Sequence, residues 1–203
     1  MNSLYRHIAI EGNIGAGKST LAKLLSDRIN ARFLPEHFED NPFLEDFYID
    51  PKRYGFTVEL SFLEERFHQI REAVKKEGIL VSDYLWEKSL VFARVNLSGE
   101  ELKLFERIYQ VMAAQMKLPD LIIYLHRTPE KLLHQIERRG RNFERTIPAE
   151  YLGKVAAGYR DLFSSENRMP VLWLDKELGP EALTDEVFKL INRRFINGLH
   201  LNP

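Results

Sequence analysis

Residues 12–19 restrict the possible folds of this chain more than any other stretch of its sequence. They read Gly12-Asn13-Ile14-Gly15-Ala16-Gly17-Lys18-Ser19 and fit the pattern G-x-x-x-x-G-K-[ST] without a mismatch. The stretch follows the apolar run 7–10 and opens a segment of helical periodicity at residues 19–29. A phosphate-binding loop requires this order of strand, loop and helix. The sequence therefore predicts a P-loop.

The residue types of this loop suit ATP and Mg²⁺. Glycines let backbone N–H groups approach phosphate oxygens, and the start of the following helix adds partial positive charge. The Lys18 ammonium can reach the β- and γ-phosphates, and the Ser19 hydroxyl can ligate the metal ion. We expect the donor site to comprise Gly12, Asn13, Ile14, Gly15, Ala16, Gly17, Lys18, Ser19 and Thr20. The motif alone does not choose among ATPases, GTPases and small-molecule kinases.

Short apolar runs alternate with longer segments of helical periodicity along the chain. The runs lie at residues 7–10, 31–34, 79–81, 121–125 and 171–174. Apolar strands separated by helices indicate an α/β fold with a parallel sheet covered on both faces. Because the 203 residues contain no repeat and no low-complexity linker, we expect one domain over 1–203.

Composition excludes several other classes of protein. The chain has no cysteine, which rules out disulfides, thiolate metal sites and a cysteine nucleophile. Its net charge of −1 gives no global basic field for nucleic acid or an anionic membrane surface. No apolar run approaches the roughly 20 residues that span a bilayer, and the N-terminus lacks the apolar core of a signal peptide. We expect a cytoplasmic protein that binds small molecules, and neither nucleic acid nor membranes.

Four stretches, in order along the chain, resemble the deoxynucleoside kinase family. They are residues 11–20; residues 35–36 with 41–44, 47–51 and 54–56; Asp83; and residues 138–144 with 151–152. The P-loop is shared by many enzymes, whereas the ordered set is much more specific. The resemblance implies a P-loop kinase fold with five parallel strands, a lid at about residues 137–146, and a homodimer joined through helices. It also implies phosphorylation of a deoxynucleoside 5′-hydroxyl by ATP with Mg²⁺.

On the acceptor side, the resemblance assigns roles to three residues. Glu36 matches the catalytic base that takes the proton from the sugar 5′-hydroxyl, and it follows an apolar strand, where ligand crevices form in parallel sheets. Tyr48 and Glu144 match residues that hold the sugar 3′-hydroxyl. Two structural interpretations stay open. Glu36 could be an exposed loop carboxylate, and Tyr48 could serve only in packing.

On the phosphate side, the resemblance assigns an acidic residue and a group of arginines. Asp83 matches the carboxylate that supports the metal and the reacting phosphate. Arg139 and Arg141 match lid arginines that clamp the transferring phosphoryl group, and Arg138 is placed at the donor. A segment punctuated by Gly140 can close over an anion and exclude water. The alternatives are that Asp83 caps the next helix and that the arginines form a solvated helix end.

The sequence departs from the family pattern directly after Asp83. The family usually has arginine there, within a D/E-R-S triplet, and this chain has Tyr84. Lys88 lies four residues further on and is a candidate source of the missing charge. The departure leaves open a nucleotide-binding family member with weak or no kinase activity that acts as an interaction subunit. A nucleotide kinase is disfavoured because the Glu36 carboxylate would repel a monophosphate acceptor.

A second departure bears on the base. The family usually has glutamine where Glu59 stands, and that glutamine reads the base edge. An ionised carboxylate only accepts hydrogen bonds, and guanine offers it two adjacent donors, N1–H and the 2-amino group. We therefore expect a purine deoxynucleoside, with guanine ahead of adenine. The alternative is that Glu59 pairs with a cation such as Arg66 or lies exposed.

Overall fold

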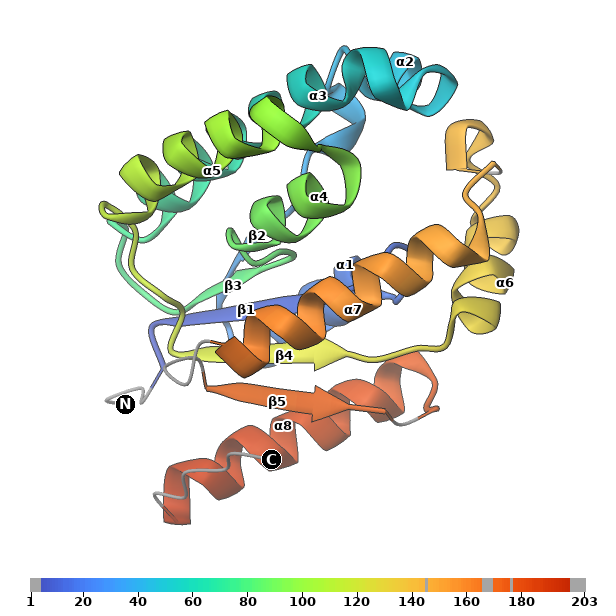
Figure 1. The fold of residues 1–203 in the computed structure, drawn as a ribbon. Helices are drawn as coiled ribbons and strands as arrows, with labels where there is room; N and C mark the ends of the chain where they lie inside the picture. The colour runs from blue at the N-terminus through green and yellow to red at the C-terminus, as the bar shows by residue number, and fades with distance from the viewer. Residues whose placement is uncertain (1–4, 145, 166–169, 176, 198–203) are drawn as a thin grey trace.

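The computed structural model describes residues 5–144, 146–165, 170–175 and 177–197, drawn in Figure 1. The strands are β1 (His7–Gly12), β2 (Arg32–Leu34), β3 (Leu80–Ser82), β4 (Leu121–Leu125) and β5 (Val171–Leu174). The helices are α1 (Lys18–Arg28), α2 (Leu44–Ile49), α3 (Pro51–Ala73), α4 (Lys88–Asn96), α5 (Gly99–Ala113), α6 (Pro129–Arg139), α7 (Ala149–Ser165) and α8 (Pro180–Asn197). Two short 3₁₀ turns, η1 (Phe38–Asp40) and η2 (Asn142–Glu144), lie between these elements.

The five strands form one parallel sheet in the order β2-β3-β1-β4-β5. Ile8 of β1 pairs with Val81 on one side and with Leu121 on the other. The expected fold class is therefore confirmed, with each apolar run forming a strand. The first helix is confirmed as well, one residue earlier than the expected 19–29.

Helices cover both faces of the sheet. Alternate residues of a strand point to opposite faces, so Ile8 and Ile10 of β1 pack toward α1 and α8, where Leu25 and Val187 complete the core. The opposite face packs against α7, through residues such as Tyr159. This two-sided burial explains why the central strands read as continuous apolar runs.

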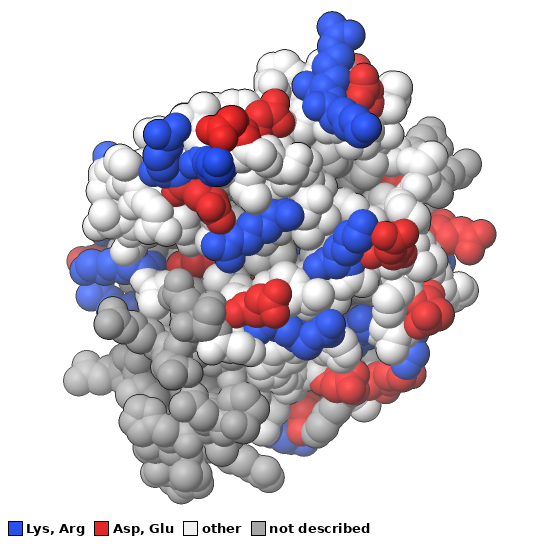
Figure 2. All heavy atoms as spheres, viewed as in Figure 1, with Lys and Arg blue, Asp and Glu red and all other residues white. Residues whose placement is uncertain are grey.

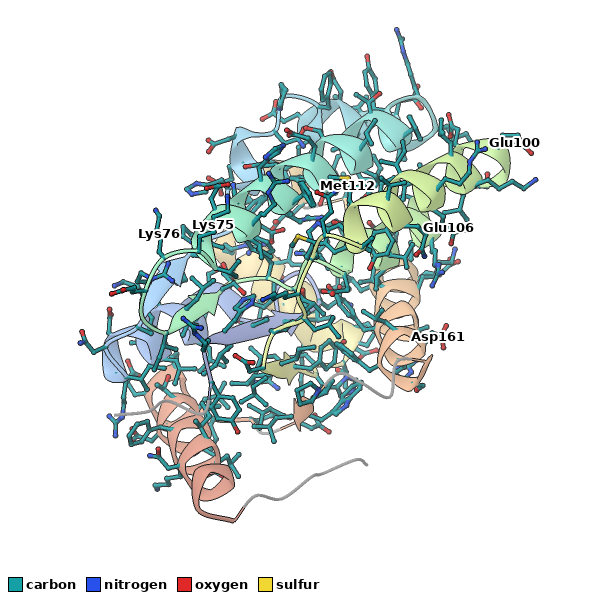
Figure 3. The ribbon with its side chains drawn as sticks, turned by 90° about the vertical axis from the view of Figure 1, so that its left-hand side faces the viewer. Lys75, Lys76, Glu100, Glu106, Met112 and Asp161 are labelled. Atoms are coloured by element: carbon teal, nitrogen blue, oxygen red, sulfur yellow. The ribbon has the colours of Figure 1, made fainter. Side chains whose placement is uncertain are left out.

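Helices α3, α4 and α5 and the loop after β3 together build a second, partly aromatic core cluster. Trp86 stacks on Tyr109 with ring centroids 4.6 Å apart, and Arg94 of α4 pairs with Glu106 of α5 at 3.0 Å. Figure 3 labels Glu100, Glu106 and Met112 along α5. The cluster supports the helices that line the site described below.

The face of the molecule in Figure 2 carries basic and acidic side chains interspersed, without a continuous basic field. Within the described residues, no helix has both the length and the apolar character needed to cross a membrane.

Candidate active site

The P-loop joins β1 to α1 at the carboxyl edge of the sheet. Gly17 precedes α1 with φ of 91°, a left-handed conformation that glycine adopts without strain. At Gly12, a Cβ would stand 2.8 Å from a carbonyl oxygen of β4, so only glycine allows this close approach. Lys18 Nζ donates to the Asn13 carbonyl at 3.1 Å, and Asn13 Nδ2 donates to the Leu152 carbonyl at 2.7 Å. The loop is thus held to itself and to α7.

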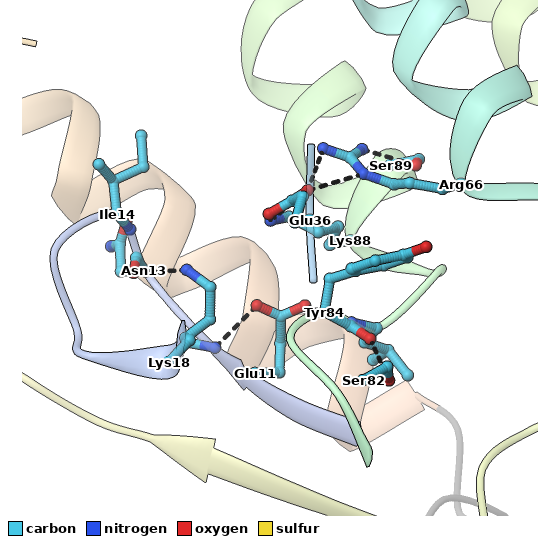
Figure 4. Close-up of polar contacts among 12 residues, drawn as sticks. Glu11, Asn13, Ile14, Lys18, Glu36, Arg66, Ser82, Tyr84, Lys88 and Ser89 are labelled. Atoms are coloured by element: carbon cyan, nitrogen blue, oxygen red, sulfur yellow. Dashed lines mark hydrogen bonds and ion pairs between the residues drawn. The ribbon is translucent and has the colours of Figure 1, made fainter. Parts of the chain in front are cut away.

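Glu36 lies just after β2, between two cations (Figure 4). Lys88 Nζ donates to both of its carboxylate oxygens, at 3.0 Å to Oε1 and 2.8 Å to Oε2. Arg66 of α3 donates to Oε1 from Nε at 3.0 Å and from Nη2 at 2.8 Å. The Glu36 side chain is only 10% exposed, so it is not the exposed loop carboxylate of the alternative interpretation.

The charges around Glu36 decide its protonation state. Burial alone would raise its pKa, but Lys88, Arg66 and Lys18 outweigh burial and lower the pKa to about 2. The carboxylate is therefore ionised at any physiological pH and is available as a hydrogen-bond acceptor.

Asp83 follows β3 and is buried, with its backbone N–H bonded to Leu34 of β2 at 2.9 Å. Helix α4 starts at Lys88, so Asp83 does not cap it. Burial raises the pKa of Asp83 to about 6, although the Lys18 charge and a hydrogen bond from Ser19 act against this. The Oδ1 atom of Asp83 is buried without a hydrogen-bond partner among the described residues. A free carboxylate oxygen beside a hydroxyl is the partial set with which proteins hold Mg²⁺ next to phosphates.

No group of three or more histidine or acidic side chains in the described part of the chain could hold a metal by itself.

The expected lid spans the end of α6, Gly140 and η2. Arg139 pairs with Glu144, and Arg141 pairs with Glu39 at 2.6 Å. The Arg141 guanidinium also lies 4.5 Å from the centroid of the Phe38 ring. These arginines are held over the site by carboxylates, so they are not merely a solvated helix end.

A neighbouring arginine of α6 does not join this pair at the site. Arg138 is exposed on α6 and does not line the cavity described below, so its placement at the donor stays a prediction. Arg145, which falls within the expected lid of about residues 137–146, lies outside the described residues.

Tyr48 and Glu144 meet where α2 faces η2. The Tyr48 ring lies 5.6 Å from the ring of Phe143. Burial, and then the nearby Glu144 charge, raise the pKa of Tyr48. Its hydroxyl is therefore a neutral donor and acceptor beside a carboxylate, a suitable pair for a sugar hydroxyl.

Glu59 is 3% exposed and lies on α3. Its Oε1 accepts a hydrogen bond from Asn96 Nδ2 at 2.7 Å, whereas its Oε2 is buried without a partner among the described residues. Arg66 pairs with Glu36 instead of Glu59. Burial raises the pKa of Glu59 to about 7, although the Asn96 bond and the charges of Arg66 and Lys88 act against it. The carboxyl thus titrates near neutrality.

One cavity brings these groups together. It has about 770 Å³ of empty space including its open mouth, which suits a small-molecule ligand. The site residues that line it are Ile14, Gly15, Lys18, Ser19, Glu36, Tyr48, Glu59, Asp83, Arg139, Arg141 and Glu144. The other expected P-loop residues do not line this cavity; they are Gly12, Asn13, Ala16, Gly17 and Thr20.

Comparisons with known proteins agree with this arrangement. A model of the family described as deoxynucleoside kinase matches residues 8–197. The chain belongs to the deoxynucleoside kinase family. It is 35% identical to a deoxyguanosine kinase of Bacillus subtilis (strain 168), over 91% of this chain and 93% of the relative. It is 34% identical to a deoxyadenosine kinase of Dictyostelium discoideum, over 97% of this chain and 83% of the relative.

A solved structure also resembles this kinase. A deoxyadenosine kinase from M. mycoides with bound dATP superposes with a TM-score of 0.83 at 26% identity, covering 93% of this chain and 100% of that one. The family, the enzyme class and the P-loop kinase fold of the chain are therefore shown.

Three buried or half-buried residues in or near the cavity gave little signal in the sequence. Arg66 interrupts the apolar face of α3, and such a buried cation could have indicated a functional pair. Asn96, at the end of α4, had no distinguishing pattern. Glu11 begins the P-loop stretch that resembles the family, but the sequence assigned it no role of its own. It is fully buried and accepts from the N–H groups of Gly12 and Leu85, both at 2.8 Å, which ties the P-loop to the loop after β3.

Proposed function

We propose that this kinase transfers the γ-phosphoryl group of ATP to the 5′-hydroxyl of a purine deoxynucleoside, in nucleotide salvage. The observation that carries the proposal is that Lys18 and Ser19 of the P-loop line the same cavity as the ionised Glu36 carboxylate. The Lys18 and Ser19 side chains suit a bound triphosphate, and the Glu36 carboxylate suits a hydroxyl nucleophile. Relatives named as deoxyguanosine and deoxyadenosine kinases support the acceptor class.

In this proposal, Glu36 accepts a hydrogen bond from the 5′-hydroxyl and takes its proton as the new P–O bond forms. Phosphoryl transfer passes through a loose transition state in most analyses, so a strong base is not required early in the reaction. A carboxylate with a pKa of about 2 therefore suits a role that orients the hydroxyl and receives its proton late. The leaving group is the β-phosphate oxygen of ADP.

Around the phosphoryl group, catalysis depends mainly on stabilising the charge of the transition state. Lys18 binds the β- and γ-phosphates, and Arg139 and Arg141 exchange their carboxylate partners for the transferring group. Ser19 and Asp83 would hold Mg²⁺, which neutralises charge on the phosphates. Tyr48 and Glu144 bind the sugar 3′-hydroxyl.

Replacing Arg141 by alanine should lower kcat by roughly 10²-fold, the usual loss for one preorganised charge donor. The KM for the nucleoside should change much less, because we place Arg141 at the phosphoryl group in the transition state. Steady-state kinetics would measure both constants. Arg28→Ala, which removes a half-exposed arginine paired with Asp185, should leave both unchanged. An effect confined to the nucleoside KM would contradict the assignment.

Base selection is the finer part of the proposal, and it rests on Glu59. Above about pH 7 the ionised Glu59 carboxylate only accepts hydrogen bonds, and guanine offers it two donors, N1–H and the 2-amino group. Below about pH 7 the protonated carboxyl offers one donor and one acceptor, which matches the N1 acceptor and 6-amino donor of adenine. The preference for guanine should therefore increase with pH.

We expect the ratio of kcat/KM for deoxyguanosine to that for deoxyadenosine to rise by roughly tenfold as pH increases through neutrality. In Glu59→Gln the ratio should shift toward adenine and lose its pH dependence, because an amide does not titrate. Titration of Asp83, with a pKa of about 6, should affect both nucleosides alike and cancel in the ratio. Glu64→Gln, on the exposed side of α3, should behave as wild type. A pH-independent wild-type ratio, or a preference for thymidine, would contradict the role of Glu59.

A phosphorylation screen of the natural nucleosides and deoxynucleosides with ATP and Mg²⁺ tests the substrate class. We expect deoxyguanosine and deoxyadenosine to be the best acceptors at neutral pH. Preferential phosphorylation of pyrimidine nucleosides would overturn the purine assignment. A cytoplasmic location and a homodimer joined through helices belong to the same proposal, whereas the inactive interaction subunit is not favoured.

A further inference from the structure

Tyr84, which stands where the family pattern usually has arginine, points away from the reacting groups. It is fully buried in the aromatic cluster between α3 and α5. Its hydroxyl donates to Gln69 Oε1 at 2.8 Å. The position directly after Asp83 therefore supplies no charge to the site and serves the packing of α3 instead.

Lys88 brings a cation into the cavity from the next helix. It is the first residue of α4 and is 5% exposed. It donates to both oxygens of Glu36, and its Nζ lies 5.4 Å from the centroid of the Phe92 ring. A buried lysine with these neighbours is fixed in one geometry, and the ion pair compensates for its desolvation.

The hydrogen bonds divide the two oxygens of Glu36 into different roles. A carboxylate oxygen has two lone pairs. Oε1 accepts from Arg66 and from Lys88, so its capacity is used. Within the described part of the chain, Oε2 accepts from Lys88 alone and keeps one lone pair for a ligand.

We propose that Lys88 replaces, from the first turn of α4, the cation missing at Tyr84, and that it positions the Glu36 carboxylate so that Oε2 receives the substrate hydroxyl. Lys88 is thus a positioning residue that acts through Glu36. Arg66, itself fixed by Ser89 Oγ at 2.9 Å, holds the other oxygen. The inference rests on the proposed role of Glu36 as the base.

A double-mutant cycle between Lys88 and Glu36 tests the inference. Lys88→Met keeps the length of the side chain beside Phe92 and removes the charge. It should lower kcat by roughly 10- to 100-fold, since a misplaced base loses much of its contribution. The nucleoside KM should change less than kcat. Lys88→Arg, which keeps a cation, should recover much of the loss, whereas a side chain needed only for packing would not be restored by a bulkier guanidinium.

The same Lys88→Met change in a Glu36→Gln background should lower kcat by less than about threefold, because residues that act as a unit are not additive. In the Glu36→Gln background Arg66 has lost its carboxylate partner, so thermal unfolding of all variants is compared to show whether a loss of activity reflects the fold. Lys75→Met, an exposed lysine labelled in Figure 3, is the control and should leave kcat unchanged.

The two proposals fail in different ways. Equal losses from Lys88→Met in both backgrounds, or no loss in the wild-type background, would overturn the positioning role and leave the base intact. Full activity of Glu36→Gln alone would overturn the proposed base.

Discussion

Replacing Glu36 by glutamine should lower turnover by about 10²–10⁴-fold, the range that general bases contribute. The amide keeps the shape of the side chain but cannot take the proton of the 5′-hydroxyl. Binding of the nucleoside should be nearly intact, because Tyr48, Glu59 and Glu144 are unchanged. The measurement is kcat with deoxyguanosine, together with the nucleoside dissociation constant at equilibrium.

The substitution also leaves the buried Lys88 and Arg66 without their common carboxylate, so thermal unfolding must be compared with wild type. Glu72→Gln, near the end of α3 with a 60% exposed side chain, is the matched control and should be neutral. A fully active, folded Glu36→Gln enzyme would contradict the assignment.

Lys18→Ala should reduce turnover by at least about 10²–10³-fold while the fold survives. Burial and the Lys88 charge lower the pKa of Lys18, whereas Glu11, Glu36 and Asp83 raise it. The ammonium therefore lies among charged groups that hold it in the site, and its removal takes away the cation proposed for the β- and γ-phosphates. ATP affinity, measured by calorimetry, should fall together with kcat.

Lys103→Ala is the control for this experiment, since Lys103 lies on α5 with its side chain 69% exposed beside Glu100. Exposed pairs of this kind contribute little, so both ATP affinity and kcat should equal those of wild type. Wild-type ATP affinity in Lys18→Ala would contradict the placement of Lys18 in the donor site.

The sheet and the position of the site could be predicted because they depend on local sequence. Apolar runs determine the strands, and the carboxyl ends of parallel strands meet at one edge. This places Glu36, Asp83 and the P-loop together without knowledge of any side-chain contact. Their convergence in one cavity agrees with that expectation.

The partners of buried side chains could not be predicted, because they depend on how helices pack. Arg66 and Glu59 lie seven residues apart on one helix, about 10 Å along its axis, and helical spacing alone does not say whether they pair. Arg66 instead reaches Glu36, and Glu59 bonds to Asn96 of α4. The inward direction of Tyr84 likewise follows from the aromatic cluster and not from its neighbours in sequence.

The most direct test of the account is transfer of label from [γ-³²P]ATP to deoxyguanosine in the presence of Mg²⁺, with the product resolved and identified. We predict labelled deoxyguanosine 5′-monophosphate, in which the labelled phosphate is bonded to the 5′-oxygen alone, and we predict that this product is lost in Glu36→Gln and Lys18→Ala. Hydrolysis of ATP without a labelled nucleotide from any deoxynucleoside, or nucleotide binding without turnover, would contradict the account.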